Sequence, residues 1–459
     1  MTCKNAPSLK GKAPKFDKSQ MLEARHVIMI AIGGVIGAGF FVGASAAILQ
    51  AGPAILLTYI LCSLVFLVLG MTFKDLALDS GVQGSFIEHI RHLLGSVAGF
   101  ASGWSYWAVW LIILTAQLIA GAAMLQPVLH LPYLVICYGL LAIMSGVNLL
   151  SVRAYGNLEY WFSFLKVSAL VVFILFGIFI LLSSHLGFTA PVPVTNNLFG
   201  HDGFAPFGWV AVLALAPTVF TGMTGIEIVS VAAQETHTPE EMVGALASKL
   251  GIWIGVIYFF SVLLVLCFIP WNGLEMTRSP FLSVLNHLQI PYAESVIWLV
   301  VLTVIFSTLN SSLFVASRVL KEMALTEAAP DFLSAGKGNN VPTRSIWCVT
   351  IAAFLLVTAS QQFPSGFFGG LLSVSGVFII FVYGLAIVAA MKMRRKLSFF
   401  GILAILFMAL VPICMLYAPQ TRLQSLLGLG SLGFFLLCGA IISRLSKRKN
   451  ASDLANLNA

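Results

Sequence analysis

Charged residues are scarce in this chain. Asp, Glu, Lys and Arg together make up 9% of its 459 residues, whereas soluble globular domains carry about 25%. Apolar residues make up 59%, and apolar runs long enough to cross a bilayer as a helix recur from end to end. The short segments of alternating hydrophobicity that are typical of a membrane β-barrel are missing. The sequence therefore predicts an all-α integral membrane protein.

Several chemical signatures are also missing from the sequence. The seven cysteines occur singly, without a C-x-x-C pair, so we expect neither a disulfide framework nor a metal site. No glycine loop followed by Lys-Ser or Lys-Thr supports ATP-driven activity. No paired carboxylates or nucleophile–base set indicates an enzyme, and no basic surface interleaved with aromatics indicates nucleic-acid binding. We expect no catalytic residues and no cofactor.

The apolar runs predict twelve membrane spans, joined by short polar or Pro/Gly-containing links. The longest external link covers 184–206, and no segment outside the spans is long enough to fold as a soluble domain. The predicted spans are 27–49, 53–72, 97–125, 132–150, 160–183, 207–233, 247–269, 292–321, 344–361, 367–391, 398–417 and 424–443.

Lys and Arg are distributed unequally between the two ends of these spans. Of the 25 basic residues, 22 fall on one side, including those of the tails 1–25 and 444–459, and only Arg278 and Arg422 fall on the other. Because basic loops stay in the cytoplasm, both termini are predicted to be cytoplasmic. The basic tails also favour contact with anionic membrane lipids. The remaining basic residue, Lys166, lies within the fifth span.

Two of the predicted spans are rich in helix breakers. The first contains "IAIGGVIGAGFFVG", with five glycines in eleven residues, and the sixth contains "APTVFTGMTGIEIVSV", with Pro217, Gly222 and Gly225. Interrupted spans in matching positions of two halves indicate inverted repeats with a binding site at mid-membrane. Close helix packing through small residues, such as Gly33 and Gly37, is the alternative interpretation of the same glycines.

A broken membrane helix exposes backbone groups that can bind a ligand. The first amides of the continuing half-helix attract an anion, while the carbonyls that end the other half attract a cation. A zwitterionic amino acid carries both charges. The paired breaks therefore favour an amino acid as the ligand.

Five segments carry a family signature in chain order. They are "LEARHVIMIAIGGVIGAGFFVGAS" (22–45), "AGPAILLTYIL" (51–61), "GVNLLSVRAYGNLEYWFSFLKV" (146–167), "TGIEIVSVAAQETHTPEE" (224–241) and "STLNSSLFVASRVL" (307–320). Together they resemble the amino acid permease family of the amino acid–polyamine–organocation superfamily. Within that family, the sequences of these segments resemble those of bacterial permeases of the γ-aminobutyrate and neutral amino acid type.

The resemblance implies an architecture that works by alternating access. A first inverted repeat of five helices would cover 26–183 and a second would cover 207–391, with helices 1 and 6 broken. Two peripheral helices would follow at 392–443. The tails 1–25 and 444–459 would lie outside the membrane.

The resemblance also implies a substrate site at the two breaks. The substrate carboxylate would be held by the amides of Ala38 and Gly39, with Gly37 beside them. The substrate amino group would be held by carbonyls of Gly34 or Val35 and of Thr221 or Gly222. The candidates for the pocket around the substrate side chain are Gln117, Met223, Thr224 and Ser375.

Three positions depart from the family pattern. Gln117 stands where many members have a carboxylate, and the region of Met223 lacks the aromatic residue that often occurs there. After the eighth span the chain reads "ALTEAAP", where many members have two arginines and a glycine. The substrate therefore stays open between neutral amino acids and γ-aminobutyrate.

Lys166 is the sharpest single feature of the sequence. An ionised lysine at mid-helix costs about 2.5–3.5 kcal/mol on insertion scales. Its stem could extend to the interface, or its amine could titrate inside the protein. The resemblance implies that a lysine ammonium replaces a sodium ion here, bridging the first break and the region of Ser307 and Ser311. On that hypothesis Lys166 couples proton entry to transport.

Two carboxylates accompany this lysine. Glu227 follows Gly225 on the sixth span, where it could cap backbone freed by the break or take part in proton coupling. Glu159 lies seven residues before Lys166, on the same helix face but roughly 10 Å lower. We expect Glu159 to sit at the interface in a structural role.

The sequence as a whole favours a secondary active amino acid importer of the cytoplasmic membrane, driven by proton symport. An amino acid exchanger is the alternative of the same class. A sensor that binds without transporting, and a channel, belong to other classes. The sequence does not indicate an oligomeric state.

Overall fold

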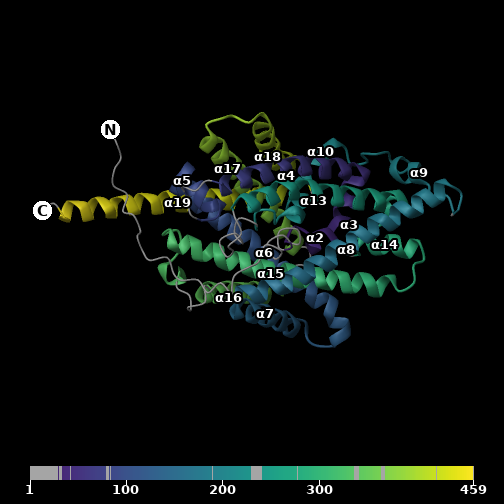
Figure 1. The fold of residues 1–459 in the computed structure, drawn as a ribbon, viewed down its shortest axis with the longest axis horizontal. Helices are drawn as coiled ribbons and strands as arrows, with labels where there is room; N and C mark the ends of the chain where they lie inside the picture. Colours follow the sequence, from purple (N-terminus) through teal and green to yellow (C-terminus); the bar gives the residue numbers. More distant parts are fainter. Residues whose placement is uncertain are drawn as a thin grey trace.

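The computed structural model describes residues 29, 34–41, 43–78, 82, 84–188, 190–228, 240–276, 278–334, 341–362, 367–419 and 421–457. The predicted tail 1–25 lies outside these ranges, as do parts of the predicted spans 27–49 and 207–233. Every regular element within them is a helix. Most of the long helices run along the long axis of the molecule, and the last one continues beyond the bundle toward the C-terminus (Figure 1).

Ten helical stretches of the described chain are long and apolar enough to cross a membrane. Nine of them match one predicted span each, and the stretch Gly43–Ala77 covers the second predicted span together with the end of the first, so that the first and the sixth have no stretch of their own. The helices that form them are α4 (Ile55–Ala77), α6 (Ser96–Leu129), α7 (Tyr133–Leu150), α8 (Val152–His185), α13 (Glu240–Phe268), α15 (Ala293–Leu325), α16 (Thr343–Ser360), α17 (Phe367–Arg394), α18 (Phe399–Tyr417) and α19 (Arg422–Leu457).

The two other predicted spans are interrupted in the described residues. The first contains α2 (Ala38–Phe41) and α3 (Gly43–Ala51), and its helical backbone lapses at Ile36 and Gly37. The sixth contains α10 (Trp209–Ala214) and α11 (Ala216–Met223), after which Thr224 is extended. These interruptions fall where the glycines predict them, and they explain why neither span forms one long helix.

Short helices occupy the links between the spans, for which the sequence predicts no regular structure. They are η2 (Gly52–Ala54), α5 (Phe86–Leu94), α9 (Val194–Phe199), η3 (Trp271–Gly273), α14 (Pro280–His287) and η4 (Asp331–Ser334). Helix α5 has complete end signals: the Ser85 side chain accepts from the Ile87 amide, and Gly95 ends the helix at a positive φ of 102°. A serine N-cap and a C-terminal glycine are what such a helix requires.

The long helices pack into a bundle with α15 near its centre. Helix α4 packs against α13, α6 packs against α15 and α17, and α7 and α16 lie together along one edge (Figure 1). In the span window of α15, 83% of residues are buried, against 28% for α18 and 22% for α19. Helix α15 is therefore the most enclosed of these long helices, whereas α18, α19 and also α8, at 22%, have few buried residues in their span windows.

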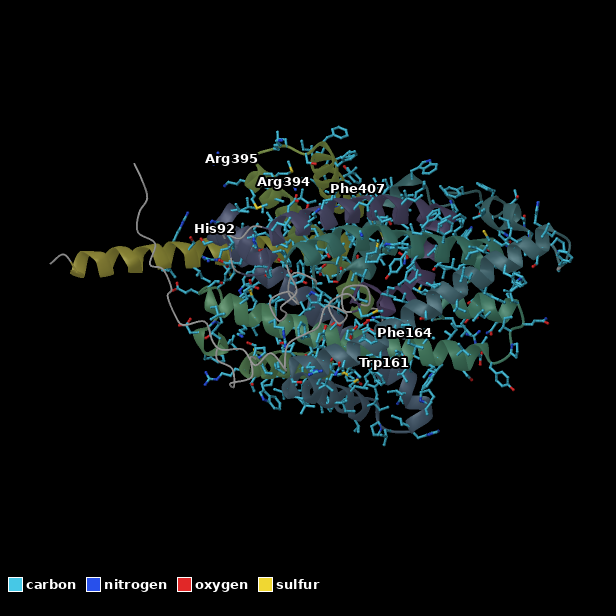
Figure 2. The ribbon with its side chains drawn as sticks, in the orientation of Figure 1. His92, Trp161, Phe164, Arg394, Arg395 and Phe407 are labelled. Carbon is cyan, nitrogen blue, oxygen red and sulfur yellow. The ribbon has the colours of Figure 1, made fainter. Side chains whose placement is uncertain are left out.

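The outer surface and one end of the bundle differ in chemistry. Trp161 and Phe164 on α8 are 67% and 50% exposed, as expected for side chains that face lipid (Figure 2). His92, Arg394 and Arg395 lie toward one end, the same end as the C-terminus (Figure 2). Apolar flanks and a basic end are the surface expected of a membrane-spanning bundle.

The contact between α17 and α11 depends on one glycine. A Cβ built on Gly376 would lie 2.5 Å from the carbonyl oxygen of Pro217, whereas one built on Gly384, two turns along the same helix, would meet nothing within 4 Å. Gly376→Ala should cost about 1–3 kcal/mol of stability, because backbone must move to admit the methyl group. Thermal melting of the detergent-purified protein measures this cost. The matched control, Gly384→Ala, should melt like the wild type, and equal melting of both variants would contradict the packing described here.

Candidate functional site

The two interrupted spans touch each other at backbone level. Gly225 has a φ of +136°, and a Cβ built on it would lie 2.6 Å from both the carbonyl carbon and oxygen of Gly34 and 2.8 Å from the Val35 nitrogen. Only glycine combines this backbone conformation with so close an approach. The break in the first span therefore packs directly against the break in the sixth span.

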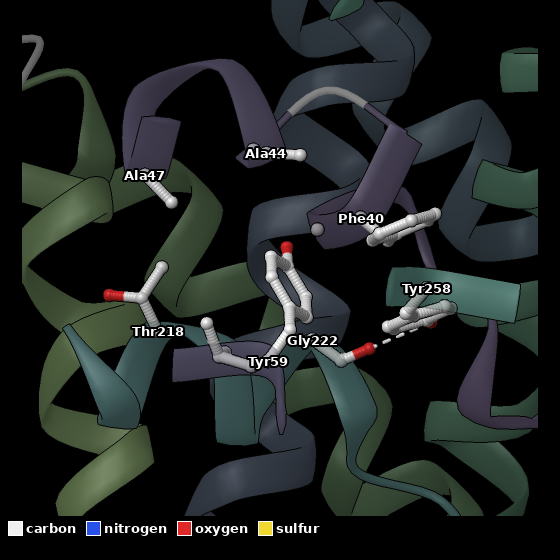
Figure 3. Close-up of a pocket in the computed structure, with 10 residues that line it drawn as sticks. Phe40, Ala44, Ala47, Tyr59, Thr218, Gly222 and Tyr258 are labelled. Atoms are coloured by element: carbon white, nitrogen blue, oxygen red, sulfur yellow. Dashed lines mark hydrogen bonds between the residues drawn. The ribbon is translucent and has the colours of Figure 1, made fainter. Parts of the chain in front are cut away.

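A tyrosine from a third helix lies between carbonyls of both breaks. The hydroxyl of Tyr258, on α13, is 3.0 Å from the carbonyl oxygen of Val35 and 3.0 Å from that of Gly222 (Figure 3). Its ring stacks on Phe40 with the centroids 3.7 Å apart, and Tyr59 of α4 packs edge-on against both rings. Tyr258 is not among the site residues predicted from the sequence. The only available signal was a phenol within an apolar span, where its hydroxyl needs a partner.

A small cavity borders this tyrosine. Its volume is about 10 Å³, room for about one water molecule. Gly39 and Phe40 of α2, Thr218 and Gly222 of α11, and Tyr258 are among the residues that line it (Figure 3). In this conformation the breaks are closed on each other, and the cavity is too small for an amino acid.

The residues predicted to hold the substrate carboxylate lie at the start of α2. This helix begins at Ala38, so the amides of Ala38 and Gly39 belong to its first turn, where helix geometry supplies no acceptor. The next amide, of Phe40, bonds the Gly37 carbonyl at 3.1 Å. Of these two residues, Gly39 lines the small cavity.

Of the residues predicted to hold the amino group, Val35 and Gly222 present their carbonyls to the same hydroxyl. Gly34 lies against Gly225. The Thr221 carbonyl accepts from the Thr224 amide at 3.4 Å, which closes the last turn of α11. The structure therefore brings together one predicted carbonyl from each break.

The four residues predicted for the side-chain pocket are buried, and none is among those that line the cavity. The Thr224 and Ser375 hydroxyls donate to nearby backbone carbonyls, of Phe220 at 2.9 Å and of Leu372 at 2.7 Å. Met223 is fully buried. The Oε1 atom of Gln117 has no hydrogen-bond partner in the part of the chain that the structure describes.

Glu227 is fully buried behind the sixth-span break. Its Oε2 accepts from the Gly225 amide at 3.1 Å and from the Tyr383 hydroxyl at 2.6 Å, and its Oε1 accepts from the Tyr106 hydroxyl at 3.0 Å. The carboxylate thus accepts a hydrogen bond from a backbone amide that the break leaves without its helical partner. It also connects the break to α6 and α17, which carry the two tyrosines.

Lys166 is buried deep within α8. It lies fourteen residues, about four turns, after the first residue of the helix. Its side chain is 1% exposed, and its Nζ donates to the Ser307 hydroxyl of α15 at 2.6 Å. The ammonium therefore ends inside the protein and does not extend to the interface. Ser311 bonds Tyr155 at 3.4 Å, and among the described residues Lys166 makes its hydrogen bond to Ser307 and its ion pair with Glu159, not a hydrogen bond to the first-span break.

The expectation that Glu159 sits at the interface is wrong. Glu159 is fully buried, and its Oε1 lies 3.6 Å from Lys166 Nζ. Helix α8 begins at Val152, eight residues before the predicted span, so Glu159 lies two turns inside the helix. Although the two residues are about 10 Å apart along the helix axis, their long side chains extend toward each other. The lysine thus has an anionic partner that the sequence analysis placed elsewhere.

Hydroxyl and amide groups complete the surroundings of this pair. The Glu159 carboxylate accepts from the hydroxyls of Ser163 and Ser307 and from Asn310 Nδ2. Asn310 Oδ1 in turn accepts from Asn148 Nδ2 at 3.1 Å. Buried charges are tolerated when they are paired and hydrogen-bonded in this way. The network joins α8 and α7 to α15.

Comparison with known proteins confirms the resemblance. The family model "Amino acid permease" matches residues 26–443. The chain is 34% identical over 379 residues to a γ-aminobutyric acid permease of Bacillus subtilis (strain 168), which covers 82% of this chain and 80% of the relative. It is 34% identical over 436 residues to a γ-aminobutyric acid permease of Escherichia coli (strain K12), which covers 91% and 92%.

An aromatic amino acid transport protein of Salmonella typhi is 29% identical over 415 residues, covering 87% of this chain and 90% of the relative. These relatives are all named as transport proteins. The ten apolar helices agree with a multi-pass membrane protein. The chain belongs to the amino acid permease family.

Proposed function

We propose that this protein is a secondary active importer of amino acids in the cytoplasmic membrane, working by alternating access. The observation that carries the proposal is the direct contact between the two breaks at Gly34 and Gly225. Irregular backbone at membrane depth is tolerated where it is buried in protein or lines a cavity. Here the irregular backbone is buried in protein and also lines a small cavity. The first-turn amides of α2 and the carbonyls of Val35 and Gly222 belong to the same two breaks.

Helix packing supports two inverted repeats at 26–183 and 207–391. Helix α4 packs on α13, and α6 packs on α15. In each pair the second helix belongs to the span five places after the first, as expected when equivalent helices meet across a two-fold axis. In our proposal, the ten long helices and the two interrupted spans make up a layout of twelve spans.

The substrate that fits this site carries one carboxylate and one ammonium group. In our proposal, Ala38 and Gly39 receive the carboxylate, with Gly37 beside them. The carbonyls of Val35 and Gly222 receive the ammonium, with Gly34 and Thr221 as their neighbours. Breaks that separate far enough to admit a substrate would present both sets of backbone groups to it.

The substrate side chain would extend toward Gln117, Met223, Thr224 and Ser375. None of these four carries a charge, and Gln117 Oε1, which has no hydrogen-bond partner among the described residues, offers an acceptor. A neutral amino acid or a γ-aminobutyrate-like substrate suits such a pocket. Two of the relatives described above are named as γ-aminobutyric acid permeases, and a third is named for aromatic amino acids.

The proposed driver is a proton bound at the Lys166–Glu159 pair. Two ionisable groups whose charged atoms lie 3.6 Å apart exchange protons as a unit. The Ser307 hydroxyl bonds both groups. The next residue, Thr308, borders Gly37, because a Cβ built on Gly37 would lie 3.5 Å from its hydroxyl. A change of protonation would thus reach the first break through two adjacent residues of α15. Glu227 could assist as a second proton site.

Uptake by the purified protein in liposomes tests this proposal. A mixed pool of labelled amino acids is offered with an inward proton gradient and, separately, with an inward sodium gradient. We expect accumulation of one or a few neutral amino acids or γ-aminobutyrate under the proton gradient alone. Protein-free liposomes and a protonophore are the controls.

The other outcomes separate the alternatives. Accumulation under sodium alone would contradict proton coupling and leave Lys166 a structural role. Efflux of loaded substrate that needs external substrate but no gradient would identify an exchanger. Binding without any flux would identify a sensor.

Variants of the buried pair test the coupling step. Lys166→Met and Glu159→Gln should each reduce gradient-driven uptake by about tenfold or more, and each should lose about 3–5 kcal/mol of stability, because a buried charge is left without its partner. The double variant should regain most of the stability but not the uptake. Melting curves and initial uptake rates measure the two effects.

Lys396→Met, which changes an exposed lysine beyond α17, is the matched control and should behave like the wild type. Gradient-driven uptake by Lys166→Met at the wild-type rate would show that the pair does not couple protons to transport.

A further inference from the structure

Tyr258 performs a task that neither the fold nor the family resemblance assigns to it. Its single O–H group lies at equal distances from two carbonyl oxygens, one on each broken span. A phenol has one proton to donate, so it can satisfy only one of these acceptors fully at a time. Among the described residues, the two carbonyls therefore share a single hydroxyl donor.

The ring of Tyr258 has little freedom to move. It is fully buried and stacks face to face on Phe40. Helix α13 is also held tightly against α4: a Cβ on Gly251 would lie 2.7 Å from the Phe66 carbonyl oxygen, and one on Gly255 would lie 2.6 Å from the Ser63 hydroxyl. The hydroxyl is thus fixed to the α4–α13 pair, whereas the carbonyls belong to the broken spans.

An ammonium group would satisfy the same carbonyls better than the phenol does. It has three N–H donors and a full positive charge, and hydrogen bonds from charged donors are stronger than those from neutral ones. The hydroxyl also borders the small cavity next to Gly39 and Gly222. The phenol therefore occupies the place that a substrate amino group requires.

We propose that the Tyr258 hydroxyl occupies the two carbonyls of the amino-group position and releases them to a substrate ammonium, so that it competes with the substrate and limits the affinity for its amino group. The inference rests on the proposed function. It adds that the Tyr258 hydroxyl competes with the substrate ammonium for the carbonyls of Val35 and Gly222. Ligands that carry N–H donors on a positive charge displace the hydroxyl from Val35 and Gly222. Carboxylic acids that lack an amino group gain nothing from these carbonyls.

Tyr258→Phe tests the proposal, because it keeps the stack on Phe40 and removes only the competing hydroxyl. The probes are the amino acid that accumulates in the uptake experiment and its deaminated counterpart: γ-aminobutyrate with butyrate, or phenylalanine with 3-phenylpropionate. We expect the dissociation constant for the amino acid to fall about threefold to tenfold, the value of one neutral hydrogen bond. The constant for the deaminated acid should not change.

Tyr138→Phe is the matched control, since it removes a tyrosine hydroxyl that bonds Thr358 on the periphery. It should leave both dissociation constants at their wild-type values. A second measurement uses the wild-type protein, whose tyrosine difference absorbance should change on addition of the amino acid but not of the deaminated acid. That change should be absent in Tyr258→Phe.

Weaker or unchanged amino acid binding by Tyr258→Phe would overturn the inference and make the hydroxyl a substrate ligand or a structural bond. An equal gain for the deaminated acid would overturn it as well, since the effect would then not depend on the amino group. If the wild type binds the amino acid, the proposed function survives either result. Failure of the wild type to bind any amino acid would overturn both.

Discussion

Backbone groups released inside an apolar bundle must find partners, and the rest of this structure depends on how that demand is met. Each unsatisfied N–H or C=O at membrane depth costs several kcal/mol. The two interrupted spans release such groups at the centre of the protein. The Gly225 amide bonds Glu227, and the carbonyls of Val35 and Gly222 share the Tyr258 hydroxyl. Side chains thus replace the helical hydrogen bonds that the breaks remove.

These replacements also determine which helices hold the breaks. Tyr258 comes from α13, and the partners of Glu227 are Tyr106 of α6 and Tyr383 of α17. The breaks are therefore fastened to three continuous helices. The same rule applies to charge: Lys166 is placed inside the bundle together with Glu159 and a hydroxyl of α15. In each of these cases a side-chain hydrogen bond connects an irregular or charged position to a rigid helix.

Sequence patterns predict most of this fold because hydrophobicity dictates the spans. The ten long helices lie where the apolar runs place them, and the breaks lie where Gly37 and Gly225 place them. Glu159 was misplaced because α8 begins at Val152, within a polar stretch that hydropathy assigns to a link. Tyr258 was missed because its role depends on the contact between two spans distant in sequence. No periodic pattern records which side chain will face a carbonyl pair across the bundle.

A break that is completed by side chains differs from a continuous helix in one important respect. Hydrogen bonds within a helix are made between neighbours of the same chain segment, and a ligand cannot replace them without unwinding the helix. Bonds from Tyr258 to Val35 and Gly222 join separate elements, so a better donor can replace them while each helix stays folded. The net value of such a bond is only about 0.5–1.5 kcal/mol. A site built on exchangeable bonds of this size can open for a substrate and close again without loss of the bundle that holds it.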